Sequence, residues 1–178
     1  FINFINSLKF PCVLIFDPHS DVTPALINSV CTFSKEEILV TGMPPKALAN
    51  IDAFVAPDAG AAKEVQQLAI LMNKEFIQGH KTRDTRTGAL SGFGYSGSVE
   101  GKNLLIIDDI CDGGGTFIGL AEALRATETP EDISLYVTHG MFTKGYDGLL
   151  KCFSTIYTTN TYISDIYKNM NITCIYKL

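Results

Sequence analysis

Residues 104–116 read Leu-Leu-Ile-Ile-Asp-Asp-Ile-Cys-Asp-Gly-Gly-Gly-Thr and form the most informative stretch of this 178-residue chain. The apolar run from Leu104 to Ile107 predicts a parallel strand that is buried on both faces. The glycines that follow allow positive φ angles and a close approach of the backbone to a ligand, and Thr116 stands where a helix is expected to begin. The stretch therefore predicts a strand, a tight loop and a helix, the unit from which doubly wound α/β sheets are built.

The same stretch has the chemistry of a sugar-phosphate site. Asp108, Asp109 and Asp112 come at the carboxyl end of the strand, where open α/β sheets bind their ligands. Backbone N–H groups of residues 113–116 suit a phosphate, while the carboxylates suit sugar hydroxyls or a metal ion held by the substrate. The alternative is a glycine-rich turn with incidental acids. It is the weaker explanation, because crowded carboxylates repel one another without a cationic or hydroxylic partner.

Composition and charge narrow the class of protein. The chain has 46% hydrophobic and 19% charged residues, which is typical of one ordinary globular domain of this length. Its formal net charge of −5 argues against general nucleic-acid binding, because nucleic-acid-binding proteins carry basic surfaces. No stretch approaches the roughly 18 uninterrupted apolar residues of a membrane span, so no membrane partner is expected.

Cysteine usage points to a reducing compartment. The chain has 5 cysteines, an odd number, and none are spaced as Cys-x-x-Cys. Neither a disulfide framework nor a structural zinc site is therefore expected. A cytoplasmic location fits this pattern best.

Apolar stretches that predict strands alternate with stretches that predict helices. A buried strand is expected over Cys12–Phe16. Further strands are expected over Glu37–Thr41, Ala53–Ala56, Glu75–Gln78, Ile133–Thr138, Thr155–Thr158 and Thr173–Tyr176, the last two at sheet edges. Helices are expected after a Thr23 cap, over Ala61–Met72 and from Phe117. The glycine-rich segment Thr85–Gly101 predicts a mobile loop or an exposed hairpin. The alternation indicates an α/β fold with a doubly wound, mostly parallel sheet flanked by helices, in one domain.

Polar residues follow other predicted strands, and we expect them to converge on the central loop because the carboxyl ends of parallel strands meet at one sheet edge. Asp17 and His19 offer a carboxylate and an imidazole to a metal ion or to phosphate oxygens. Asp58 lies between a strand and a helix start, where small neighbours allow an anion to approach. The ordinary alternatives are a turn-stabilising role for His19 and a turn or helix-capping role for Asp58.

A cationic segment follows the predicted strand over Glu75–Gln78. It contains Lys81, Arg83 and Arg86. Such a run is commonly a solvated face, but beside a sugar-phosphate site these cations suit the neutralisation of charge that develops on a phosphate chain during transfer.

The motifs together resemble a known family. Residues 104–116 are similar to the phosphoribosyl pyrophosphate (PRPP) motif of type I phosphoribosyltransferases and of ribose-phosphate pyrophosphokinases. Three other segments favour the second group: Phe16-Asp17-Pro18-His19-Ser20 resembles its Asp-Leu-His segment, Pro57-Asp58-Ala59-Gly60 its Pro-Asp-x-Gly loop, and Lys81-Thr82-Arg83 the start of its catalytic flexible loop. Val99–Lys102 and Tyr136–Phe142 also match in order and spacing. The resemblance runs from Phe16 to Phe142 and, more weakly, through Ser164-Asp165.

This resemblance implies a type I phosphoribosyltransferase-like fold and a Mg²⁺-dependent reaction. The diphosphoryl group of ATP passes to C1 of ribose 5-phosphate, which gives PRPP and AMP. The resemblance implies that the ribose hydroxyls contact Asp108, Asp109 and Asp112, and that the 5-phosphate contacts Gly113, Gly114, Gly115 and Thr116. It implies metal and ATP-phosphate contacts for His19 and Asp58, and catalytic roles for Lys81 and Arg83. It also implies a homo-oligomer in the full-length context.

The chain departs from the family pattern in three respects. Gly113 stands where a threonine is common, which removes one hydroxyl from the phosphate loop, and Ala59-Gly60-Ala61 has one glycine where two are frequent. A ribose-phosphate pyrophosphokinase also has an N-terminal domain that supplies much of the adenine pocket and the subunit contacts. Our chain begins at Phe1 on a sequence typical of the inside of an element, so we expect that a preceding portion is missing and that these residues form half of the active site.

Two other functions remain open at this point. A type I phosphoribosyltransferase would consume PRPP and needs a hood that recognises the base, for which the sequence offers no convincing candidate. A non-catalytic regulatory or assembly subunit would keep the fold and the ligand site. The missing N-terminal half favours that alternative, whereas Lys81 and Arg83 argue against it.

Overall fold

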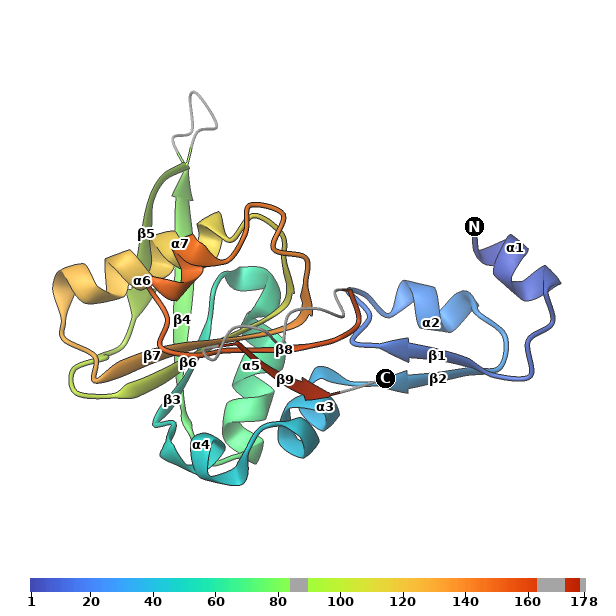
Figure 1. The fold of residues 1–178 in the computed structure, drawn as a ribbon, viewed down its shortest axis with the longest axis horizontal. Coiled ribbons are helices and arrows are strands. Elements are labelled where there is room, and N and C mark those ends of the chain that lie inside the picture. Colours follow the sequence, from blue (N-terminus) through green and yellow to red (C-terminus); the bar gives the residue numbers. More distant parts are fainter. Residues whose placement is uncertain (84–89, 163–171, 177–178) are drawn as a thin grey trace.

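The computed structural model describes residues 1–83, 90–162 and 172–176, and within these ranges its main feature is one twisted sheet (Figure 1). The strands lie in the order β5-β4-β3-β6-β7-β8-β9. Their bounds are β3 Ala53–Ala56, β4 Glu75–Arg83, β5 Leu90–Ser96, β6 Asn103–Cys111, β7 Asp132–Gly140, β8 Ile156–Thr159 and β9 Ile172–Tyr176. All neighbouring pairs are parallel except the β4–β5 hairpin. The expected mostly parallel sheet is confirmed.

Helices cover both faces of this sheet, as a doubly wound fold requires. One face carries α3 (Lys35–Gly42), α4 (Pro45–Asn50) and α5 (Ala59–Leu71), and the other carries α6 (Gly115–Thr127) and α7 (Asp147–Leu150). Alternate residues of β6 divide between the two layers: Leu104 and Ile106 pack with α6, and Leu105 and Ile107 pack with α5. All four are fully buried, and each contributes roughly 1.5–3 kcal/mol by leaving water.

A second, two-stranded parallel sheet extends to one side of the main sheet (Figure 1). It pairs β1 (Val13–Phe16) with β2 (Val30–Phe33), and α1 (Ile2–Ser7) and α2 (Val22–Leu26) accompany it. The prediction that the first strand is buried is wrong, because β1 lies outside the main sheet and no described layer covers Leu14, which is 57% exposed.

The predicted strand over Glu37–Thr41 is also wrong, since these residues belong to α3. Ser34 caps the helix: its hydroxyl accepts a hydrogen bond from the backbone N–H of Glu37, and the Glu37 carboxylate accepts one from the backbone N–H of Ser34. This capping box outweighs the apolar Ile-Leu-Val run that suggested a strand. The predicted Thr23 cap is likewise misplaced, because α2 starts at Val22 with Asp21 before it.

Most other elements agree with the predictions in type and differ in length. Strands β4, β6 and β7 continue beyond their apolar runs into the polar residues of the predicted site, so Asp108 and Asp109 lie inside β6. The glycine-rich segment Thr85–Gly101 supplies β5 of an antiparallel hairpin, while residues 84–89 lie outside the described ranges. Strand β8 lies between β7 and β9, so it is not an edge strand.

Among the described helices, none has the length and apolar character needed to cross a membrane.

Candidate active site

The loop between β6 and α6 has the shape of an anion site. Gly114 precedes the helix with φ +76°, a left-handed conformation that costs a residue with a side chain roughly 1–2 kcal/mol. No described side chain caps α6, so the N–H groups of its first turn are available to a ligand. Residues 113–116, which we call the glycine loop, therefore present backbone donors at the carboxyl end of the central strand.

Asp108 and Asp109 form a half-buried acidic pair beside the glycine loop. The backbone N–H of Asp109 donates to Oδ1 of Asp108 at 3.0 Å, and His19 Nδ1 lies 2.6 Å from Oδ2 of Asp109. Burial and the neighbouring charge of Asp109 raise the pKa of Asp108 to about 7. Burial also acts on Asp109, but the hydrogen bond from His19 and the charge of Lys35 hold its pKa below the usual value. Of the two carboxyl groups, Asp108 is therefore the one that holds a proton more readily.

His19 reaches this pair from the loop that follows β1. Its hydrogen bond to Asp109 raises the pKa of the imidazole above its ordinary value. The ring itself is 83% exposed, so one side remains open to solvent or to a ligand. The structure thus joins two residues that the sequence separates by 90 positions.

A buried network holds residues 17–21, which follow β1 and which we call the β1 loop, in place. Lys35 is 8% exposed, and its ammonium lies 2.8 Å from Glu64 and 3.9 Å from Asp17. The other carboxylate oxygen of Asp17 accepts a hydrogen bond from the Thr138 hydroxyl at the end of β7. Burial raises the pKa of Asp17 despite the charge of Lys35, and the charges of Asp17 and Glu64 raise the pKa of Lys35 against the effect of burial.

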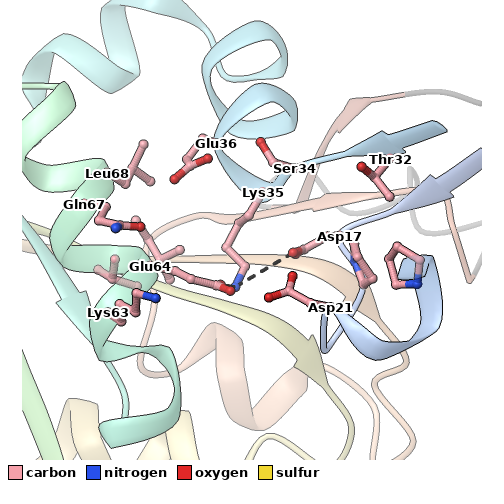
Figure 2. Close-up of a pocket in the computed structure, with 14 residues that line it drawn as sticks. Asp17, Asp21, Thr32, Ser34, Lys35, Glu36, Lys63, Glu64, Gln67 and Leu68 are labelled. Carbon is pink, nitrogen blue, oxygen red and sulfur yellow. Dashed lines mark hydrogen bonds and ion pairs between the residues drawn. The ribbon is translucent and has the colours of Figure 1, made fainter. Parts of the chain in front are cut away.

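Lys35, Asp17 and Glu64 line a pocket of about 360 Å³ between α5, the start of α3 and the β1 loop. Figure 2 shows Lys35 pointing across it toward Asp17 and Glu64. Its lining includes Ile107 of β6 but none of residues 113–116, so the glycine loop is not part of this pocket. Sequence reasoning missed Lys35, because three consecutive charged residues, Lys35-Glu36-Glu37, are typical of a solvated face.

Asp58 and Lys81 form a second charged pair at the same edge of the sheet. Lys81 Nζ lies 2.8 Å from Oδ2 of Asp58. Oδ1 of Asp58 accepts from the backbone N–H groups of Gly60 and Ala61 and so caps α5. Burial acts against the ionised form, but Lys81 and the two amides hold the pKa of Asp58 below its usual value. Both the capping role and an electrostatic role are therefore present.

The register of the strands brings the acidic pair Asp108–Asp109 and the Asp58–Lys81 pair to the same edge of the main sheet. Ala56 of β3 aligns with Gln78 of β4, Val55 aligns with Ile106 of β6, and Asp108 aligns with Val137 of β7.

Of Arg83 the structure describes only the backbone, in β4, and Arg86 and Ser164-Asp165 lie outside the described residues. The remaining predicted carboxylate, Asp112, is exposed and accepts a hydrogen bond from the Thr143 hydroxyl at 2.5 Å.

The donor set fits a magnesium ion that arrives with phosphate. No group of three or more His, Cys, Asp or Glu side chains is placed to hold an ion within the described residues. Mg²⁺ prefers carboxylate oxygens and commonly takes its other ligands from water and substrate phosphates. Asp108, Asp109 and Asp58 offer such oxygens, whereas the imidazole of His19 suits softer metals and is already bonded to Asp109.

Comparison with known proteins agrees with this geometry. A sequence model of the phosphoribosyl transferase domain family matches residues 45–156, more than half of the chain. The ribose-phosphate pyrophosphokinase of Maricaulis maris is 36% identical over 95 residues, which cover 53% of this chain and 30% of that protein. The ribose-phosphate pyrophosphokinase of Pyrococcus abyssi is 32% identical over 143 residues, 76% of this chain and 50% of that protein. The chain thus spans half or less of the length of these relatives.

Solved structures share the fold. The crystal structure of phosphoribosylpyrophosphate synthetase from Mycobacterium smegmatis matches with a TM-score of 0.82 and 23% identity, over 99% of this chain and 57% of that chain. Orotate phosphoribosyltransferase from Aeropyrum pernix matches with a TM-score of 0.52 and 16% identity, over 79% of this chain and 67% of that chain. Because the family model matches more than half of the chain, the chain is a member of the phosphoribosyl transferase domain family.

Proposed function

We propose that this chain supplies the ribose 5-phosphate half of a ribose-phosphate pyrophosphokinase site. The observation that carries the proposal is the acidic pair Asp108–Asp109, held by His19 and followed after three intervening residues by the glycine loop, where α6 begins without a side-chain cap. Carboxylates and backbone amides in that order suit the hydroxyls and the phosphate of one sugar phosphate. The curated relatives of Maricaulis maris and Pyrococcus abyssi, both ribose-phosphate pyrophosphokinases, support this choice.

The two carboxylates of the pair take different parts in binding the sugar. Asp109, ionised, accepts hydrogen bonds from ribose hydroxyls. Asp108, whose pKa is about 7, also donates a hydrogen bond to a ribose oxygen when it holds a proton. Asp112, at the start of the loop, completes the set of carboxylates. Residues 113–116 hold the 5-phosphate through their N–H groups.

Transfer of the diphosphoryl group requires little covalent chemistry from the protein, because positioning and charge stabilisation carry it. Lys81, paired with Asp58, brings a positive charge to the edge of the sheet where the phosphates meet. The resemblance of Lys81-Thr82-Arg83 to the catalytic loop of ribose-phosphate pyrophosphokinases assigns the second positive charge to Arg83. Asp108, Asp109 and Asp58 would hold a Mg²⁺ ion that arrives with the donor phosphates, and this ion would supply further neutralisation of negative charge. ATP as donor, a homo-oligomeric full-length enzyme and a cytoplasmic location belong to the same proposal.

Two measurements test the proposal. Calorimetry with ribose 5-phosphate should give a dissociation constant that Asp108→Asn/Asp109→Asn weakens at least tenfold while the thermal transition remains cooperative. Unchanged affinity would remove the acidic pair from the site.

An assay with ATP, ribose 5-phosphate and Mg²⁺, on the chain and on any longer polypeptide that contains it, should release AMP only when the sugar phosphate is present. Pyrophosphate release from PRPP and a base would instead indicate a phosphoribosyltransferase. Ribose 5-phosphate binding without AMP formation in the longer polypeptide would indicate a non-catalytic homologue.

A further inference from the structure

The loop that follows β7 lies directly against the glycine loop. The backbone N–H groups of Met141 and Phe142 donate to the carbonyl oxygen of Cys111 at 2.9 and 3.1 Å. The backbone N–H of Thr143 donates to the carbonyl oxygen of Asp112 at 3.1 Å, and its hydroxyl donates to the Asp112 carboxylate at 2.5 Å. Residues 141–145, which we call the strap, are therefore joined through residues 141–143 to the segment that enters the glycine loop.

The strap has one defined shape. Phe142 is 5% exposed and has φ +47°, and its ring folds back onto Gly140, where an added Cβ would lie 2.2 Å from a ring carbon. The backbone N–H of Gly145 then donates to the carbonyl oxygen of Phe142 at 2.8 Å, which closes a turn with Thr143 and Lys144 at its centre. The turn therefore holds the backbone of the exposed residue Lys144 next to the glycine loop.

The stem of Lys144 fills the space in which a side chain at position 113 would lie. A Cβ built on Gly113 would meet Cδ, Cε and Cγ of Lys144 at 3.2, 3.3 and 3.6 Å. The ammonium is one C–N bond beyond Cε, about 1.5 Å farther, so it lies beside the glycine loop. Lys144 forms no ion pair with any residue that the structure describes. Its charge is free to meet an anion.

We propose that Lys144 is a phosphate-binding residue of the glycine loop and that the absence of a side chain at Gly113 makes room for its stem. The inference rests on the proposed function, because it assigns the phosphate subsite of the same ligand. A lysine ammonium is a strong point-charge partner for phosphate, and its hydrogen bonds to phosphate are stronger than those of a neutral hydroxyl. Gly113 and Lys144 act together, since a larger residue at 113 would displace the lysine stem.

Three variants separate the charge of Lys144 from its packing. Lys144→Met keeps an unbranched stem over Gly113 and removes the charge, while Lys144→Arg keeps the charge. Lys151→Met is the matched control, because Lys151 is exposed in the segment after α7 and its loss changes the net charge equally. Calorimetry measures the dissociation constants of inorganic phosphate and of ribose 5-phosphate for each protein.

Lys144→Met should weaken the binding of both probes by tenfold or more, the usual loss for a charged hydrogen bond. Lys144→Arg should stay within about threefold of wild type, and Lys151→Met within about twofold, and none should move the thermal midpoint. Equal phosphate affinity of wild type and Lys144→Met, or no phosphate binding by wild type, would overturn the inference. Lys144-dependent binding of phosphate without binding of ribose 5-phosphate would keep the inference and reject the proposed function.

Discussion

Replacing Lys35 with Met tests whether the buried network stabilises the protein through charge or through packing. Met preserves most of the stem volume but leaves Asp17, 7% exposed, without its cation. Removing one partner of a buried ion pair typically costs about 3–5 kcal/mol. Here the pair is long, at 3.9 Å, Asp17 keeps its hydrogen bond from Thr138, and Glu64 is 58% exposed and loses little. We therefore expect a loss of about 1–3 kcal/mol in the free energy of unfolding at pH 8.

The pH dependence gives the sharper test. Burial already raises the pKa of Asp17 above its unfolded value, and loss of the Lys35 charge raises it further. The folded variant then binds a proton that the unfolded chain releases, so its stability falls as pH rises from the unfolded pKa to the folded pKa of Asp17. The cost of Lys35→Met relative to wild type should accordingly be smaller at pH 5 than at pH 8.

Urea unfolding followed by circular dichroism measures both effects. Lys63→Met is the matched control, because Lys63 lines the same pocket from the exposed side of α5, and it should cost under about 0.5 kcal/mol. The double variant Lys35→Met/Asp17→Asn should recover part of the loss, since no buried charge remains unpaired. Equal costs for Lys35→Met and Lys63→Met, or a cost that does not change with pH, would refute the electrostatic account.

Three further predictions concern the site itself. Gly114→Ala should destabilise the chain by about 1–2 kcal/mol in urea unfolding, because alanine is strained at φ +76° and its Cβ would lie 3.0 Å from Leu149. An NMR titration should place the pKa of His19 above about 6.5, and Asp109→Asn should bring it back toward that value; an unchanged pKa would contradict the hydrogen bond. Lys81→Ala in the active full-length enzyme should lower kcat far more than it raises KM, whereas a KM effect alone would make Lys81 an ordinary binding residue.

The sequence was sufficient where one local pattern decided the structure. Leu104–Ile107 and Ala53–Ala56 are continuous apolar runs, and both are buried strands of the main sheet. It misled where two local patterns competed, as at Glu37–Thr41, where the capping box with Ser34 favours a helix and the apolar run favours a strand. A closer search for Ser-x-x-Glu spacing would have found this helix.

Local sequence patterns could not predict contacts between residues that lie far apart in the chain. Thr138 and Asp17 are 121 positions apart, and the partners of Lys35 lie on a strand-end loop and on another helix. Their meeting depends on how the β1 loop packs against β7 and α5, which neither periodicity nor motif spacing encodes. The same holds for the stem of Lys144 over Gly113, since its position depends on the turn that follows β7.

The acidic pair shows how the sheet gives two identical neighbours different chemistry. Successive side chains of a strand point to opposite faces of the sheet. Leu104 and Ile106 lie on the α6 face and Leu105 and Ile107 on the α5 face, so continued alternation predicts Asp108 on the α6 face and Asp109 on the α5 face. On the α5 face lie the β1 loop with His19 and the pocket with Lys35, which together lower the pKa of Asp109. Asp108 lacks the His19 contact, so burial dominates and its pKa rises to about 7. A one-residue shift in the register of β6 would exchange these environments, and for this reason the chemistry of the pair depends on the packing of the β1 loop as much as on the motif itself.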